Sequence, residues 1–190
     1  VTGVQTCALP IYRTEEALAG VAAGAGTKAR VTETQAALRK ELTDWSDADF
    51  AEHMARGYAD YWLSSDVPTL ARQARLVRQA ERERAPLTVD TRVDRARGVT
   101  EVVIYTADHP GLFSRLCGAM ALAGANIAGA QICTLSNGMA LDTFLLQSSS
   151  ADGSGSQAAL RPERIARLAT HIEQALSGRI RLRDALTKRP

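Results

Sequence analysis

The sequence predicts an α+β protein with a helical N-terminal half and a C-terminal domain of the order βαββαβ. Between residues 28 and 84, apolar residues recur every three or four positions, which is the spacing of a helix face. From residue 86 onward, stretches of strand-like alternation flank two further helical patterns. Strands and helices in that order form an antiparallel sheet with both helices on one face.

The composition is that of an ordinary globular protein. The 190 residues allow one domain with an appendage, or two small domains. A hydrophobic share of 45% and a net charge of +2 give no sign of a nucleic-acid or membrane partner. The three cysteines are scattered and lack metal-binding spacing. We therefore expect no metal site, and we expect a cytoplasmic location because a reducing compartment suits unpaired cysteines.

We expect four segments along the chain. Residues 1–11 look like a translated sequencing-library adapter and are left out of the fold prediction, so the natural chain is expected to continue upstream. Residues 12–85 should form a helical linker region. Residues 86–186 should form the sheet domain with an extra N-terminal strand, and residues 187–190 a tail.

The linker region should contain three helices. The first covers residues 28–42, because Gly24 and Gly26 disfavour a helix before it. The second begins at Ser46, a residue type that caps helix N-termini. The third has Pro68 in its first turn, where proline is tolerated.

Two features of the linker region could be structural or functional. The three aromatic residues within 58–62 predict a packing anchor. Arg72, Arg75, Arg78 and Arg82 fall at helical spacing and could contact an anion or a nucleotide. Because glutamates interrupt this stripe, we favour a solvated helix face.

The apolar residues of the sheet domain predict that both faces of the sheet are buried against other parts of the protein. Residues 87–93 alternate apolar and polar side chains and should pair with residues 99–106 as a hairpin. Residues 102–106 and 140–146 carry apolar side chains on both faces. The two helices cover only one face, so the other face must pack against a further partner.

The remaining elements follow from turn and helix signals. Residues 112–123 and 162–178 have the apolar stripes of core-facing helices, with glycine at or after the end of each. Residues 126–134 should form a strand, and the Asn-Gly pair at 137–138 predicts a type I′ hairpin turn. Residues 180–182 could form a short last strand.

The turn Asp108-His109-Pro110-Gly111-Leu112 is the candidate ligand site. Pro110 fixes φ before the helix, and Gly111 allows close approach of a ligand to the backbone. Free N–H groups of the helix N-terminus favour a carboxylate, while Asp108 can accept from an ammonium group. The turn therefore suits both ends of an α-amino acid. The alternative is that Asp108 merely caps the helix, and the motif alone leaves these two interpretations open.

Three runs carry a family resemblance: YTADHPGLFSRL at 105–116, GAMALAGANI at 118–127 and NGMALDTF at 137–144. They resemble the first ACT domain of the PII uridylyltransferase/uridylyl-removing enzyme family. The resemblance implies a ferredoxin-like fold over 86–186 and glutamine as the ligand of a sensing domain. It also implies that Asn126 and Ile127 complete the pocket, and that a second ACT repeat covers the open sheet face.

The same resemblance implies that this chain is regulatory and has no catalytic residues of its own. Nucleotidyltransferase and phosphohydrolase motifs are not found in the sequence. The parent enzyme would use Mg²⁺ and UTP, act on the PII signal protein and control nitrogen assimilation. Residues 128–130 and 148–150 depart from the family pattern, which leaves pocket shape and loop contacts open.

Three alternatives stay beside the glutamine sensor. An ACT domain could dock other domains without binding a ligand, and the sequence cannot separate this from sensing. It could instead serve an amino-acid biosynthetic enzyme, although the flanking segment 58–94 argues against this. An RNA-binding domain of the same topology would need stacking aromatics on its third strand, whereas residues 140–144 read Ala-Leu-Asp-Thr-Phe.

Overall fold

The computed structural model describes residues 23–148 and 158–180. The adapter-like segment 1–11, the first residues of the linker region, most of the polar loop after Ser148, residues 181–182 of the expected last strand and the tail 187–190 lie outside these ranges.

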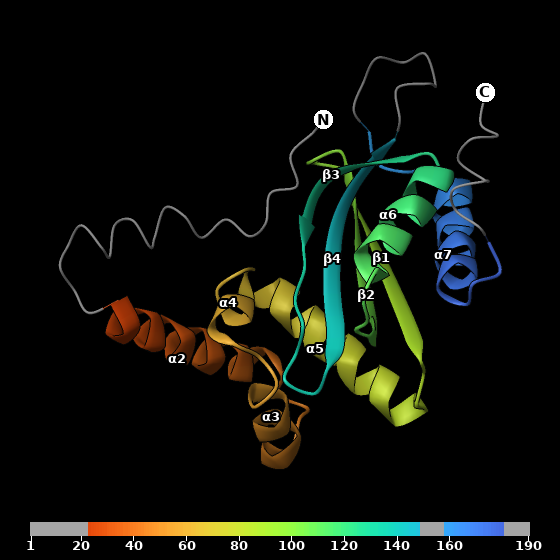
Figure 1. Cartoon of the computed structure of the whole chain (residues 1–190). Helices are drawn as coiled ribbons and strands as arrows, with labels where there is room; N and C mark the ends of the chain where they lie inside the picture. The colour runs from red at the N-terminus through yellow and green to blue at the C-terminus, as the bar shows by residue number, and fades with distance from the viewer. Residues whose placement is uncertain (1–22, 149–157, 181–190) are drawn as a thin grey trace.

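The described chain has the α+β order that the sequence predicts (Figure 1). The helical region precedes the sheet, and two helices are inserted between and after the strands. The elements are α2 (Ala23–Glu41), α3 (Asp47–Met54), α4 (Ala59–Trp62), α5 (Val67–Glu83), β1 (Leu87–Asp94), β2 (Val99–Ala107), α6 (Leu112–Leu122), β3 (Ala125–Gln131), β4 (Met139–Ser148) and α7 (Pro162–Leu176).

The four strands form one antiparallel sheet of order β1-β2-β4-β3. The extra N-terminal strand is confirmed as β1, which pairs along its whole length with β2, from Leu87 opposite Thr106 to Asp94 opposite Val99. In a βαββαβ sheet a strand following the second helix joins at the side of the first strand. Here β1 occupies that edge.

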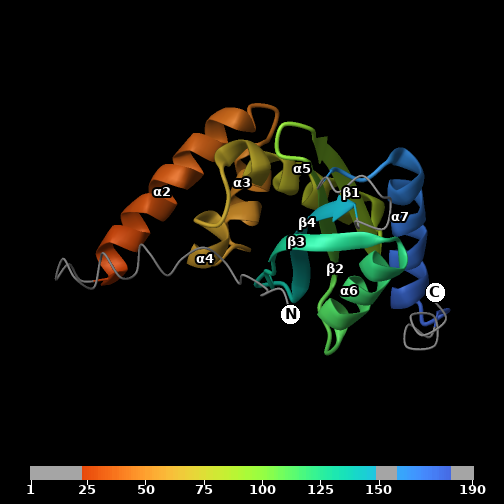
Figure 2. The same ribbon diagram turned by 90° about the horizontal axis from the view of Figure 1, so that it is seen from above.

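Helices α6 and α7 pack on one face of the sheet, as predicted (Figure 2). The buried stripes of both helices meet the inward residues of β2 and β4, which forms the first hydrophobic core. Its most buried members are Val102, Ile104, Leu116, Ala119, Met120, Phe144, Leu146, Leu168 and Ile172. This packing fixes where β2 ends and α6 begins, and so fixes the candidate turn between them.

The opposite face of the sheet is covered by the chain's own helical region. The prediction that another domain covers this face is wrong for the area that α5 covers. Val103, Tyr105 and Leu141 point to this side and share a second core with α5, whose buried stripe includes Leu70 and Val77. The amphipathic helix α5 supplies the apolar cover that the sheet needs.

Charged and polar contacts also hold α5 to the sheet. Arg72 was expected on a solvated face, but it pairs with Asp90 at 3.0 Å and with Glu101 at 2.7 Å. Glu101 is nearly buried, so this pair lies within the interface. Gln73 donates a hydrogen bond to the Thr143 hydroxyl at 3.0 Å. One part of the arginine stripe is therefore structural.

The N-caps of two helices are confirmed. Two predictions that rest on glycine positions are wrong. Ser46 caps α3 as predicted, and an aspartate caps α5. Gly24 and Gly26 lie inside α2, so the prediction that they exclude a helix is wrong. The β3–β4 turn is not type I′, because Gly138 has φ +77° whereas Asn137 does not have a positive φ. Leu135 donates its N–H to the Met139 carbonyl at 2.8 Å, so residues 136–138 form the tip of the turn, and among these three the glycine alone takes the left-handed conformation.

The aromatic segment is confirmed as a packing anchor. Tyr61 and Trp62 are almost fully buried, whereas Tyr58 is exposed. With Trp45 they surround His53, whose ring is 5.7 Å from each tryptophan ring in edge-on geometry. Burial, and secondarily a nearby arginine, lowers the pKa of His53 to about 4. The helical region therefore has its own aromatic core around a neutral histidine.

Candidate functional site

The candidate turn lies where β2 ends and α6 begins, and its residues Asp108 to Gly111 are exposed. The backbone of Asp108 donates a hydrogen bond to the Gly138 carbonyl at 3.1 Å, and its carboxylate accepts one from the Thr134 hydroxyl at 2.6 Å. The turn is therefore tied to the β3–β4 hairpin, and the Asp108 carboxylate is held in place at the surface.

Asp108 does not cap α6. The N-cap is Gly111, at φ +84° and with no side-chain hydrogen bond to the helix. Leu112 donates its N–H to the His109 carbonyl at 3.1 Å. Among the described residues, the next two N–H groups, of Phe113 and Ser114, have no acceptor. The first turn of α6 can therefore accept an anion.

His109 is not placed for catalysis in this structure. Within the described ranges, its exposed ring has one hydrogen-bond partner, the Pro110 carbonyl, with Nδ1 3.1 Å from that oxygen. In the described part of the chain, no group of three or more His, Cys, Asp or Glu side chains is arranged to hold a metal ion. The described helices also include none long and apolar enough to cross a membrane.

A buried carboxylate lies behind the turn. Asp142 on β4 is about 1% exposed and accepts a hydrogen bond from the backbone N–H of Cys133 at 3.3 Å. Burial raises the pKa of Asp142 to about 6, and the nearby Asp108 carboxylate adds to this rise. Burial also raises the pKa of the half-buried Cys117 thiol, with the same aspartate as a lesser cause. Cys117 is therefore an unreactive thiol in this environment.

Asn126 and Ile127 do not lie beside the candidate turn. Asn126 pairs with Gln147 and Ile127 with Leu146, which in turn pairs with Thr100 at the start of β2. The turn follows Ala107 at the other end of β2, seven residues further on. At about 3.3 Å per residue along β2, the end of the sheet that holds Asn126 and Ile127 is roughly 23 Å from the turn. Within one chain, these two residues cannot line the same small pocket as the turn.

The β3–β4 hairpin also touches the helical region. Ser136 donates its backbone N–H to the Arg56 carbonyl at 2.9 Å and its hydroxyl to the Ala55 carbonyl at 3.0 Å. Asn137 donates to the Tyr105 hydroxyl at 3.3 Å, and that hydroxyl donates to Glu81 at 3.1 Å. The hairpin therefore connects the candidate turn with the end of α3 and with α5.

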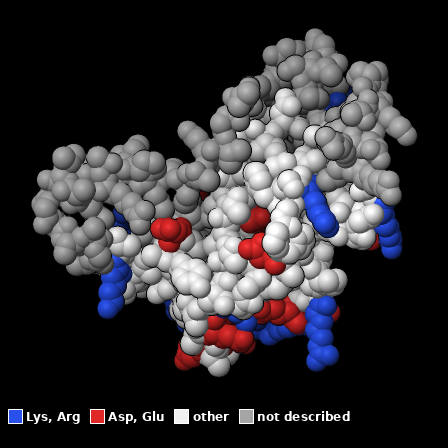
Figure 3. Space-filling model, in the orientation of Figure 1, with Lys and Arg blue, Asp and Glu red and all other residues white. Residues whose placement is uncertain are grey.

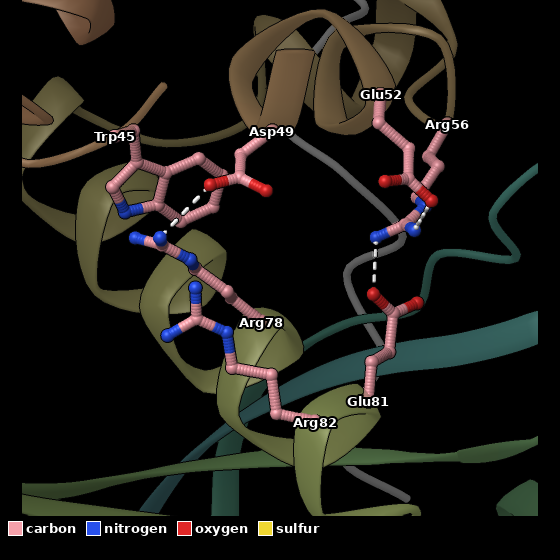
Figure 4. Close-up of a pocket in the computed structure, with 7 residues that line it drawn as sticks. All are labelled: Trp45, Asp49, Glu52, Arg56, Arg78, Glu81 and Arg82. Carbon is pink, nitrogen blue, oxygen red and sulfur yellow. Dashed lines mark hydrogen bonds and ion pairs between the residues drawn. The ribbon is translucent and has the colours of Figure 1, made fainter. Parts of the chain in front are cut away.

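A second candidate site is a charged cleft between α3 and α5, with a volume of about 260 Å³ (Figure 4). Acidic and basic side chains gather at the lower edge of the molecule in Figure 3. The cleft is lined by Trp45, Asp49, Glu52, Arg56, Arg78, Glu81 and Arg82.

Ion pairs hold two arginines at opposite sides of the charged cleft. Arg78 lies over the Trp45 ring, 4.7 Å from its centroid, and pairs with Asp49 at 2.9 Å. Arg56 pairs with Glu52 at 2.6 Å and with Glu81 at 2.7 Å. The prediction of a solvated face is therefore also wrong for Arg78.

Sequence reasoning found only part of this cleft. The arginine spacing on α5 pointed to Arg78 and Arg82, but the partners on α3 were missed. The sequence contains a pattern that could have revealed them, because Asp49, Glu52 and Arg56 are spaced three and four residues apart on one helix face. What the sequence did not show was that α3 lies across α5.

The sheet with its two helices, docked on a helical region, defines a ferredoxin-like α+β domain with a helical extension. Comparison with known proteins gives the relationship. The chain is 50% identical over 177 residues to the bifunctional uridylyltransferase/uridylyl-removing enzyme of Azospirillum brasilense. It is 40% identical over 178 residues to the Nitrobacter hamburgensis enzyme of that name and 41% identical over 175 residues to the Gluconobacter oxydans one.

These alignments cover 92–94% of this chain but only 18–19% of each relative. The chain is therefore homologous to one segment of the bifunctional uridylyltransferase/uridylyl-removing enzymes, and the sequence resemblance is confirmed. It spans about a fifth of the length of these curated relatives. No family model matches the chain, and no solved structure matches it.

Proposed function

We propose that this chain is the regulatory segment of a bifunctional uridylyltransferase/uridylyl-removing enzyme, and that it senses glutamine through an ACT-type domain. The observation that carries the proposal is the turn at 108–112. It combines an exposed, fixed carboxylate with uncapped N–H groups at the start of α6. These groups complement the ammonium and the carboxylate of an α-amino acid.

The homology supports a regulatory rather than a catalytic role for the turn, because the matched segment is a small part of much longer enzymes. We assign uridylyl transfer and its Mg²⁺ and UTP to other parts of the cytoplasmic parent protein, together with recognition of the PII signal protein. Binding at the turn would act on those parts through the β3–β4 hairpin, which contacts both the turn and α3.

In this proposal, Asn126 and Ile127 do not contribute to the site at the turn of their own chain, and the equivalent residues of a neighbouring domain do. They lie on β3 at an edge of the sheet, far from the turn of the same chain. A second ACT repeat or a second copy, placed edge to edge in antiparallel orientation, would bring its own equivalent residues toward this turn. The ligand site would then be shared between two domains.

Calorimetric titration with L-glutamine and L-glutamate tests the proposal. We expect heat with glutamine alone, and its loss in Asp108→Ala but not in Asp60→Ala, an exposed aspartate on α4. The titration is repeated on a full-length relative to include a shared site. If neither protein releases heat, the chain is a docking domain without a ligand and the sensing proposal is wrong.

A further inference from the structure

The charged cleft between α3 and α5 presents polar atoms that the fold itself does not use. Arg82 lines the cleft from α5 and points into it (Figure 4). It makes no hydrogen bond or ion pair with any described residue. Its neighbour Arg78 is also cationic, so two guanidinium groups lie close together on one wall. An anion placed between them would be attracted by both.

The opposite wall offers the complementary charge. Asp49 and Glu52 lie three residues apart on one face of α3. Each uses one carboxylate oxygen in its ion pair, Oδ2 in Asp49 and Oε1 in Glu52. Their other oxygens have no partner among the described residues and border the hollow (Figure 4). A primary ammonium group has three donors and suits two such acceptors.

The size and rigidity of the cleft suit a small molecule. Its volume of about 260 Å³ is close to the lower limit for pockets that hold small ligands. The Arg78–Trp45 contact and the two ion pairs of Arg56 fix the walls before any ligand arrives. A second hollow of about 360 Å³ shares Trp45, Arg78 and Arg82, so Arg82 lies between two open spaces.

From these contacts we propose that the charged cleft binds a small zwitterion with a carboxylate and a primary ammonium group, such as an α-amino acid. The carboxylate would pair with Arg82 and Arg78, and the ammonium group with the free oxygens of Asp49 and Glu52. This site is separate from the turn at 108–112. The two are linked, because Arg56 lines the cleft and its carbonyl accepts the hydrogen bond from Ser136.

Binding is measured by tryptophan fluorescence in the full chain carrying Asp108→Ala, so that the turn does not contribute. Trp45 borders the cleft and acts as the reporter. The probes are L-alanine, acetate and ethylammonium, at constant ionic strength. We expect a saturable change with L-alanine. Acetate and ethylammonium should bind at least roughly tenfold more weakly, because each forms only one of the two charge-assisted contacts.

Two variants complete the test. Arg82→Gln should weaken L-alanine binding at least roughly tenfold, whereas Arg167→Gln, which changes an exposed arginine on α7, should leave it unchanged. No saturable change, equal binding of acetate, or equal binding by Arg82→Gln would overturn the proposal. In those cases the cleft would be an ion-paired surface or a docking site for another protein segment. Because the cleft would also bind glutamine and glutamate, the calorimetric titration of the turn is carried out in the Arg82→Gln background, where the cleft does not contribute. Failure of the cleft proposal then leaves the test of the turn unaffected.

Discussion

The buried Asp142 carboxylate should make the folded state less stable as the pH rises. The pKa of this group is raised from 3.8 to about 6 in the folded protein. Between these values the folded state binds the proton more tightly than the unfolded state does. The contribution of Asp142 to stability is therefore lost as the pH rises from about 4 through 6, and above that range the folded protein contains a buried negative charge at this position.

The difference of about two pKa units corresponds to about 3 kcal/mol of unfolding free energy. Asp142→Asn removes the charge and keeps an oxygen that can accept from the Cys133 N–H. The new amide donors add a cost that does not change with pH. The stability of the variant relative to wild type should therefore rise by about 2.5 kcal/mol between pH 4 and pH 7.5, because part of the effect already falls below pH 4. The corresponding change in relative Tm is roughly 5–10 °C.

Urea denaturation of both proteins, followed by tryptophan fluorescence at five pH values, measures this difference. Comparing variant with wild type cancels the titration of all other groups, provided that unfolding is two-state. Asp60→Asn, at an exposed position, is the control and should give a pH-independent difference. A pH-independent difference for Asp142→Asn as well would refute the assignment of a raised pKa to this group.

Three further outcomes follow from burial and packing. His53 is buried and neutral with its pKa lowered to about 4, so the contribution of this group to stability should be lost as the pH falls from 6.5 to 4, opposite in sign to that of Asp142. His53→Phe should remove up to about 3 kcal/mol of that loss, measured in the same urea series. Arg72→Met removes the pairs with Asp90 and Glu101 but leaves Glu101 paired with Arg92, so it should cost about 2 kcal/mol. Arg167→Met, at an exposed position on α7, should cost under about 0.5 kcal/mol in thermal unfolding. A Cβ on Gly57 would lie 2.5–2.6 Å from the two aromatic rings of α4, so Gly57→Ala should cost about 1–3 kcal/mol. Gly129→Ala should cost less, because its nearest contact is 3.5 Å.

Each of these outcomes can fail in a defined way. Unchanged acid sensitivity in His53→Phe would place that titration elsewhere. Equal costs for the two arginine variants would mean that the α5–sheet ion pair contributes nothing specific. Equal melting temperatures for the two glycine variants would show that the α4 rings shift to accept a methyl group.

Local chemistry explains which parts of the fold were predictable. Ser46 caps α3 because its side chain and the α3 N–H groups are adjacent in sequence. The stripe of α7 and the alternation of β1 are likewise short-range patterns. The cover of the open sheet face was not predictable in the same way, because an apolar face requires a partner without specifying which one. The amphipathic pattern of α5 was visible, but its target was not.

The site shows the same division between local and long-range information. The turn at 108–112 lies within five consecutive residues, so its groups come together automatically. Arg72 and Arg78 were placed in solvent because their acidic partners lie far away in sequence, for example 29 residues for Arg78 and Asp49. The distance between Asn126 and the turn of its own chain also follows from the topology. After a strand and a crossover helix, the next parallel strand begins at the end of the sheet where the first one began.

The most direct test of the central claim is an NMR titration of the ¹⁵N-labelled chain with L-glutamine. The account predicts that the largest amide shifts occur at Gly111, Phe113 and Ser114, with smaller shifts in the hairpin at Ser136. L-Glutamate at equal concentration should leave these signals in place. Shifts confined to other elements, or shifts of equal size with both amino acids, would contradict the claim that this turn senses glutamine.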